Sequence, residues 1–329
     1  MSILAESGQA AQQAAEGQET SRNIEGRTQW QLTWRRLRND KVSMIALGVV
    51  ILIILIAIAA PAFAAITGHP VDAAYPDTGE DASGNPVGPG VNGFWLGTDS
   101  TGRDLLVRIV YGARISLFVG IVTTFIAVVL GTAVGLIAGY FGGFIDTILA
   151  RLTDAVLAFP YVLLALALAT VFGPSLTLIV ALITFFSWAG IARIVRGQTL
   201  SLKEKEYIEA ARSLGAGPFR IMFLDILPNL LAPVLVVATL YIPNAVVFES
   251  TLSYLGLGVQ APTPSWGNML SDAQNFYQVA WWYLVFPALA LLITTLAFNL
   301  LGDGIRDAMD PRTEKLIAAR RMRRRNTRR

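Results

Sequence analysis

The chain has 329 residues, of which 54% are hydrophobic and only 15% are charged, and its mean hydropathy is +0.54. A composition this apolar indicates that lipid is the main solvent, so we expect most of the chain to be embedded in a membrane. The formal net charge is +3, and the absence of cysteine excludes a disulfide framework, a thiolate nucleophile and a cysteine metal site.

The N-terminal region divides into two predicted segments. Residues 1–29 are polar, rich in Ala, Gln, Glu and Ser, and lack the apolar core of a signal peptide, so we expect a disordered tail. Residues 30–41 are predicted to form an interfacial amphipathic helix, because Trp30, Trp34 and Leu37 recur at helical spacing among basic side chains.

Long uncharged runs follow at 42–65, 115–145, 155–192, 226–248 and 273–302. Each exceeds the roughly 20 residues that a membrane-spanning helix needs. The third run is too long for one crossing of a ~30 Å hydrocarbon core, and Gly173 to Ser175 offers a turn near its middle. The sequence therefore predicts an all-α polytopic membrane protein with six transmembrane helices between residues 42 and 302.

The basic residues predict the orientation of these helices. With a cytoplasmic N-terminus, all 26 lysines and arginines except Arg103, Arg108 and Arg114 fall on the cytoplasmic side. We therefore expect loops 66–114 and 256–278 outside, and the polar segment 198–228 and the basic tail 303–329 inside. The arginine cluster of that tail suits anionic lipid better than nucleic acid, because no aromatic stacking platform accompanies it.

A few residues within this frame carry chemical or packing signals. The only histidine, His69, is predicted to be a solvated loop side chain, because metal sites and catalytic triads need partners that it lacks. Gly131, Gly135 and Gly139 recur on one helix face and predict close helix packing in lipid. Outer-interface positions are predicted for Trp266, Trp281 and Trp282.

The translocation of a solute would require residues that line a path. Pro243, Asn244 and Glu249 are candidates, because proline can kink a span and free carbonyls toward a cavity. Packing is the alternative role for these three residues. The acids Asp146, Asp154 and Glu249 fall at predicted span edges rather than inside spans, which disfavours an intramembrane proton or sodium path.

Residues 207–229 predict a polar helical hairpin between two spans. Glu209, Ala210 and Ala211 favour a helix, Gly215 can end it in a left-handed conformation, and Pro218 suits the start of the next. Pro228 is predicted to punctuate that second helix. The small side chains would let another protein approach, beside an apolar ridge of Tyr207, Ile208 and Leu214. An ordinary cytoplasmic hairpin fits the same spacing.

Three segments resemble one protein family. Glu-Ala-Ala at 209–211, Gly215 and the later Leu-Pro at 227–228 are similar to the EAA loop of permease subunits of bacterial ABC importers. Residues 96–117 and 255–267 resemble the peptide and nickel branch of that family, of the dipeptide and oligopeptide permease C type, and the likeness covers about 96–312. Asp225, Val107 and Ala261 depart from the expected pattern, which leaves the cargo open.

The resemblance implies a permease subunit that forms half of a translocation path for di- or oligopeptides in a bacterial inner membrane. It implies a second related permease subunit, two ATPase subunits that bind ATP and magnesium, and an external substrate-binding protein. In a permease of this family, the residues that couple to the ATPase would be 207–211, Leu214, Gly215 and Pro228. The chain itself has no Gly-Lys phosphate-binding motif, so we expect it to bind no cofactor and to be no enzyme. Import of nickel or a nickel chelate and a self-contained secondary transporter are the alternatives.

Overall fold

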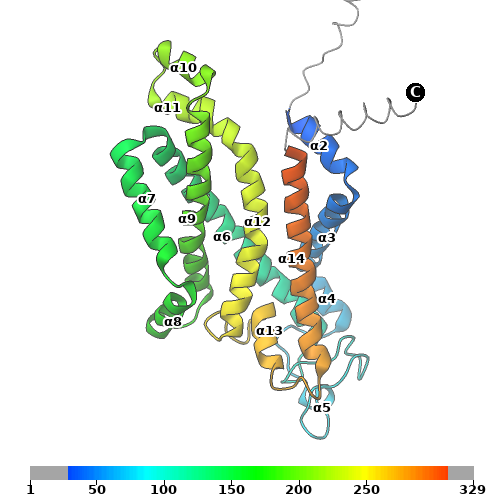
Figure 1. Ribbon diagram of the computed structural model, residues 1–329. Coiled ribbons are helices and arrows are strands. Elements are labelled where there is room, and N and C mark those ends of the chain that lie inside the picture. The colour runs from blue at the N-terminus through cyan, green and yellow to red at the C-terminus, as the bar shows by residue number, and fades with distance from the viewer. Residues whose placement is uncertain (1–28, 310–329) are drawn as a thin grey trace, which may run out of the picture.

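The protein is a bundle of helices, and its computed structural model describes residues 29–309 (Figure 1). Within that range there is no β-strand, and side chains are described from Gln31 on, apart from Leu32. The helices are α2 (Gln29–Asn39), α3 (Lys41–Ile58), α4 (Ala60–Thr67), α5 (Pro76–Gly79), α6 (Leu105–Phe141), α7 (Gly143–Ala158), α8 (Tyr161–Phe172), α9 (Leu176–Leu202), α10 (Glu206–Ser213), α11 (Pro218–Arg220), the π-helix η1 (Ile221–Ile226), α12 (Leu227–Tyr254), α13 (Trp266–Ala273) and α14 (Trp281–Met309).

Five helical segments in the described range are long and apolar enough to cross a membrane: α3, α6, α9, the continuous run from α11 to α12, and α14. The consecutive helices α7 and α8 meet the same test as a pair, but they are bent by 78° at the break between them. The predicted all-α polytopic fold is confirmed, with six spans when the bent pair is counted as one.

The bent pair changes the boundaries expected for the third apolar run. Its turn at Gly173 is confirmed, because α8 ends at Phe172 and α9 begins at Leu176. The helical segment before that turn, however, starts at Gly143 rather than at residue 155. The uncharged run could not extend across Arg151 and Asp154, which are charged. In the structure both residues belong to α7, and Asp154 pairs with Arg193 of α9 at 2.6 Å.

The two segments expected outside the membrane contain more helix than predicted. Helix α6 begins at Leu105, where Asp104 accepts a hydrogen bond from the backbone N–H of Val107 as its N-cap, so the segment expected over 66–114 is non-helical only from Gly68 to Asp104, apart from α5. Arg108 and Arg114 therefore belong to α6. Helix α13 forms within 256–278, started by a capping box between Ser265 and Asn268.

The ends of the described range also differ from expectation. Helix α2 stops at Asn39, because the side chain of Asp40 accepts the N–H groups of Val42 and Ser43 and starts α3. Leu37 is buried, with α2 packed on α14, whereas Trp34 is exposed, so the expected apolar stripe is split. Helix α14 continues past residue 302 to Met309. The tails 1–28 and 310–329 and the side chain of Trp30 lie outside the described part of the chain.

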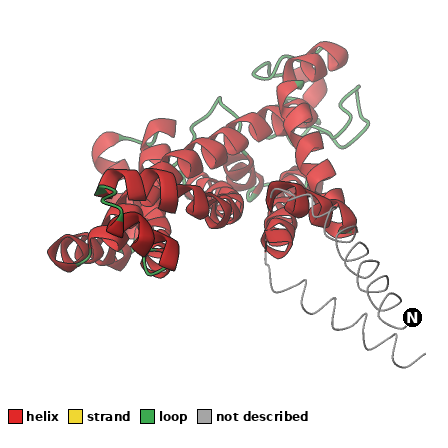
Figure 2. Ribbon diagram, turned by 90° about the horizontal axis from the view of Figure 1, so that it is seen from above, coloured by secondary structure: helices red, strands yellow, loops and turns green. Residues whose placement is uncertain are grey.

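The helices form two groups when viewed from above (Figure 2), with α6 packed against members of both. In one group α6 packs most extensively on α9, and in the other α14 packs on α3 and α2. Gly131, Gly135 and Gly139 explain the first contact: a Cβ at Gly135 would lie 2.5 Å from the carbonyl oxygen of Ala192, and one at Gly139 would lie 2.6 Å from Cβ of Thr199. The predicted small-residue packing is confirmed.

Candidate functional site

A short helical hairpin projects from the end of the bundle where α9 stops and α11 begins (Figure 1). Helix α10 ends in a Schellman motif: the N–H of Gly215 donates to the carbonyl of Arg212, and that of Ala216 donates to the carbonyl of Ala211. Gly215 has φ +82°, a left-handed conformation that suits glycine, and Pro218 stands in the first turn of α11. The predicted turn chemistry is confirmed.

The apolar side chains of the hairpin do not form the single exposed ridge that was expected. Ile208 is 0% exposed and packs with Met222 and Ile226 in an apolar cluster beneath the hairpin, whereas Leu214 is 89% exposed. Tyr207 is also exposed. Ile208 therefore anchors α10 to the membrane domain, while Tyr207, Glu209, Ala210 and Leu214 remain available on its surface.

Pro228 does not end the second helix of the hairpin, contrary to prediction. It lies in the first turn of α12, directly after the π-helix η1, and the chain runs helically through it from Pro218 to Tyr254. The hairpin thus leads into one continuous helical run that crosses the apolar bundle, and a displacement of α11 would act directly on α12.

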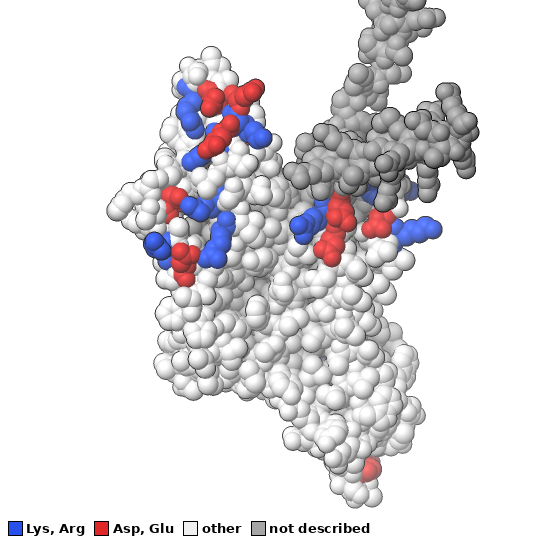
Figure 3. Space-filling model, viewed as in Figure 1, with Lys and Arg blue, Asp and Glu red and all other residues white. Residues whose placement is uncertain are grey.

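Charged side chains gather at the hairpin end of the molecule, as the view in Figure 3 shows. Helix α10 contributes exposed Glu206, Glu209 and Arg212. Below it, Arg196 pairs with Asp146 and Arg193 with Asp154, which fasten α7 to α9. On the same face the opposite half of the molecule is almost free of charge (Figure 3). The hairpin is therefore a polar, protein-accessible surface next to an apolar body.

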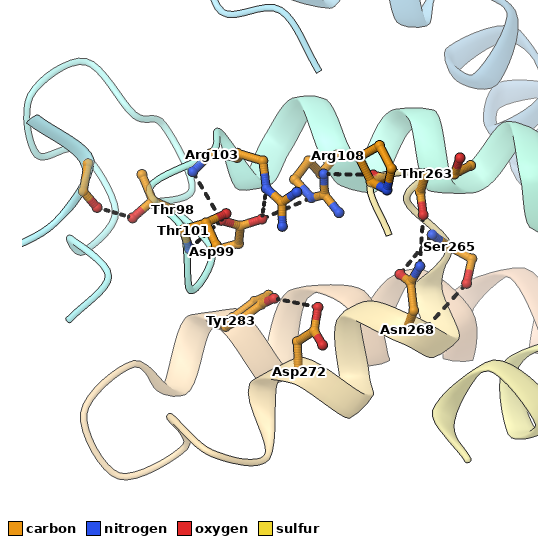
Figure 4. A network of polar contacts seen from close by, with 12 residues as sticks. Thr98, Asp99, Thr101, Arg103, Arg108, Thr263, Ser265, Asn268, Asp272 and Tyr283 are labelled. Atoms are coloured by element: carbon orange, nitrogen blue, oxygen red, sulfur yellow. Dashed lines mark hydrogen bonds and ion pairs between the residues drawn. The ribbon is translucent and has the colours of Figure 1, made fainter. Parts of the chain in front are cut away.

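At the end of the bundle away from the hairpin (Figure 1), residues 68–104 and α13 form a compact region, which we call the outer lobe after the orientation that the basic residues predict. Its centre is Asp99, which is 0% exposed (Figure 4). One carboxylate oxygen accepts the N–H groups of Thr101 and Arg103, and the other accepts Nε of Arg103 at 2.7 Å and lies 3.0 Å from Nε of Arg108. The network ties the lobe to the first turns of α6, because Arg108 belongs to that helix.

Helix α13 and the start of α14 complete this network. Arg108 donates through a terminal guanidinium nitrogen to the carbonyl of Pro262, and the hydroxyl of Tyr283 lies 3.5 Å from Asp272 (Figure 4). Burial raises the pKa of the Asp272 carboxyl, while the nearby Arg108 opposes that rise. Two acids and two arginines thus share one largely water-excluded centre.

His69 is not the solvated loop side chain that we predicted. Its Nδ1 lies 2.7 Å from the carboxylate of Asp104, its ring stacks on Phe94 with centroids 4.6 Å apart, and only 17% of the side chain is exposed. The sequence did not reveal Asp104 as the partner of His69, because Asp104 lies 35 residues further along the chain. The histidine closes the outer lobe against the N-cap of α6.

The three tryptophans expected at the outer interface have different positions. Trp281 is exposed, but Trp266 is 1% exposed and donates from its indole N–H to the carbonyl of Ile109 at 3.1 Å. Trp282 packs on Gly97, where a Cβ would lie 2.7 Å from the indole nitrogen. The prediction is wrong for Trp266, whose ring instead fills the joint between α13 and α6.

The path candidates are also separated by the structure. Glu249 is 0% exposed and accepts hydrogen bonds at 2.8 Å from the hydroxyl of Ser116, which joins α12 to α6, and from that of Ser253 on α12 itself. Pro243 is buried as well, whereas Asn244 is exposed. In the described chain Glu249 and Pro243 therefore contribute packing contacts, and only Asn244 reaches an open surface.

Comparison with known proteins agrees with this architecture. The pattern of a family described as "Binding-protein-dependent transport system inner membrane component" matches residues 131–315, and that of the "N-terminal TM domain of oligopeptide transport permease C" matches residues 28–82. The oligopeptide transport system permease protein OppC of Haemophilus influenzae is 43% identical over 88% of this chain and 90% of its own length. The chain belongs to this permease family.

Other relatives within the permease family carry related names. The dipeptide transport system permease protein DppC of Alkalihalophilus pseudofirmus is 42% identical over 86% of this chain and 90% of its own length. The glutathione transport system permease protein GsiD of Pectobacterium atrosepticum is 41% identical over 87% of the chain and 92% of its own. The protein is accordingly a multi-pass inner-membrane permease of the OppC type.

Among solved structures, an inward-facing form of the MetNI methionine ABC transporter shares the fold of this permease. The TM-score is 0.52 at 21% identity, and the match covers 63% of this chain and 98% of that one. The sequence analysis did not predict the buried Asp99 network, although Asp99, Arg103 and Arg108 stand in the segment 96–117 that resembles the family.

Proposed function

We propose that this permease forms half of the translocation path of an ATP-driven importer of short peptides, paired with a second related permease subunit. The exposed hairpin carries the proposal, because an inner-membrane component without a nucleotide-binding motif needs a surface through which an ATPase acts. Relatives named for oligopeptide, dipeptide and glutathione transport support a peptide cargo.

In this proposal the hairpin docks onto one of the two ATPase subunits of the complex, and those subunits bind the ATP and magnesium. Glu209 would contact a basic or polar group of the ATPase, since it is exposed beside Ala210, whose small side chain permits close approach. Ile208 holds α10 on the cluster around Met222, so that a force on the hairpin is transmitted into α11 and α12. An external substrate-binding protein would deliver the peptide to the opposite end of the bundle.

The alternatives have less support. Nickel import would need imidazole, thiolate or clustered carboxylate ligands, and no group of three such side chains able to hold an ion occurs in residues 29–309. A self-contained carrier would need ionisable groups along a path, but Asp146 and Asp154 are paired with arginines and Glu249 is enclosed by serine hydroxyls.

The function is tested in vesicles that contain either this permease alone or the complex with its partner permease, ATPases and binding protein. We expect uptake of labelled di- and tripeptides only by the complete complex and only with ATP, because this chain supplies no nucleotide site. Peptide uptake by the purified chain without ATP would overturn the importer and favour a secondary carrier.

The orientation is tested with single cysteines, which is straightforward because the chain has none. We expect Asn85→Cys, in the outer lobe, to react with an impermeant thiol reagent in intact cells, and Lys203→Cys, next to the hairpin, to react only after the membrane is opened. The reverse pattern would place the hairpin outside the cell and would exclude it as the ATPase contact.

A further inference from the structure

One face of α12 carries polar side chains although no described helix covers it. Asn244, Val247, Thr251 and Tyr254 are exposed and recur at intervals of three or four residues, so they form one stripe along the helix. The opposite face of α12 is packed: Val246 and Ile242 meet Gly120 of α6, which passes behind α12 in Figure 1. The stripe thus points away from the core of this subunit.

Lipid is a poor neighbour for this stripe. The side-chain amide of Asn244 donates to the carbonyl of Leu240 at 2.8 Å, which leaves its carbonyl oxygen without a hydrogen-bond donor in the described chain. Thr251 is satisfied by the carbonyl of Val247. An amide oxygen without a donor in hydrocarbon is costly, and polar side chains inside spans usually face a water-filled cavity or another helix.

Helix α14 presents a second exposed amide at the same depth. Gly302 of α14 packs against Thr239 and Leu240 of α12, where a Cβ would meet Leu240 at 2.7 Å, and this contact sets the register of the antiparallel pair. Asn244 follows Leu240 by four residues, and Asn299 precedes Gly302 by three. Because the helices are antiparallel, both amides therefore lie about one turn from the contact, in the direction of the outer lobe. Asn299 is exposed and makes no hydrogen bond within the described chain.

Rotation places both amides on the same side of the helix pair. Successive residues of a helix are rotated by about 100° around its axis, and in one view along the axes the two antiparallel helices turn in opposite senses. Starting from the contact between Gly302 and Leu240, these rotations place Asn244 and Asn299 on the same side of the pair, away from α6 and α3. The burial pattern agrees, because the neighbours Leu292, Leu296 and Asp303 of Asn299 are exposed, whereas Leu301 and Ala297 face α3.

We propose that Asn244 and Asn299 form an amide pair that contacts the backbone of the peptide cargo midway along the translocation path. The inference rests on the proposed peptide import and assigns the path to the open face of α12 and α14. A carboxamide offers one acceptor oxygen and two N–H donors, which match the C=O and N–H of a peptide group without selecting any side chain. The exposed apolar residues Val247 and Phe248 beside Asn244 leave room for varied cargo side chains.

Cysteine accessibility tests whether this face is wet. In the complete complex, Asn244→Cys and Asn299→Cys are expected to react with a small charged thiosulfonate reagent, and transported dipeptide is expected to slow the reaction. Phe125→Cys on α6, an exposed apolar position, is the control and should stay unreactive. Absence of reaction at positions 244 and 299 during ATP turnover would show that the face is packed against the partner permease or lipid, and would overturn the proposal.

Transport kinetics test the contact itself. Asn244→Leu removes hydrogen bonding at similar volume, and we expect peptide uptake at limiting concentration to fall about tenfold, since one hydrogen bond contributes on the order of that factor. ATPase stimulation by the unloaded binding protein should remain normal. Unchanged uptake in both Asn244→Leu and Asn299→Leu would refute the amide pair while leaving peptide import intact, whereas a wild-type complex that imports no peptide would refute the proposed function.

Discussion

Replacing Asp99 by alanine is expected to destabilise the outer lobe more than any other single change to a polar residue there. The substitution leaves Arg108 buried among α6, α13 and α14 without its carboxylate partner, and removing one member of a buried ion pair typically costs about 3–5 kcal/mol. The same carboxylate also accepts the N–H groups of Thr101 and Arg103, which shape the turn before α6. The melting temperature of the detergent-solubilised protein and protease resistance of residues 68–104 measure the loss.

Two further variants separate this explanation from a general sensitivity of the loop. Asp81→Ala removes a carboxylate from the same lobe, but Asp81 is fully exposed and caps only a local turn through Ser83 and Asn85, so little change in melting temperature is expected. Combining Asp99→Ala with Arg108→Met removes the unpaired buried charge and should restore part of the melting temperature that Asp99→Ala loses. If the double variant is no more stable than Asp99→Ala, the buried arginine is not the source of the cost.

Local signals in the sequence predicted the elements whose causes are local. The Schellman turn at Gly215, the start of α11 at Pro218 and the glycine seam of α6 follow from neighbouring residue types and spacing, and the structure has each of them. Span positions also followed from hydropathy, because a helix of about 20 apolar residues is required wherever the chain crosses lipid.

Features that depend on distant partners were not predictable in this way. Asp154 and Arg151 interrupt an apolar run and so appeared to end a span, although the helix continues because Asp154 is paired with Arg193. Trp266 was expected at the membrane interface, but α13 holds it against α6, where its indole N–H donates to the carbonyl of Ile109. His69 lacked a visible partner because Asp104 is adjacent only after the outer lobe folds. These three errors share one origin, a contact between residues far apart in the sequence.

Gly215→Val is expected to reduce ATP-driven uptake at least about tenfold while leaving membrane insertion unchanged. Gly215 has φ +82°, and a β-branched residue there costs on the order of 1–3 kcal/mol even though a Cβ would meet no atom within 4 Å. Because 1.4 kcal/mol is a factor of ten in an equilibrium, the ratio of the Schellman turn that presents Glu209 to competing conformations would fall on the order of tenfold. Uptake and ATPase binding in the same vesicles measure the effect.

The chain contains a closely matched control for this strain. Gly217 lies two residues further along the same exposed turn, has φ −72° and ψ 159°, and also has no atom within 4 Å of an added Cβ. Valine suits that extended conformation, particularly before Pro218, so Gly217→Val should transport at close to the wild-type rate. Equal losses in both variants would mean that added bulk, rather than backbone conformation, disturbs the ATPase contact. Normal uptake in Gly215→Val would show that the turn does not transmit the coupling, because only the left-handed position distinguishes the two glycines.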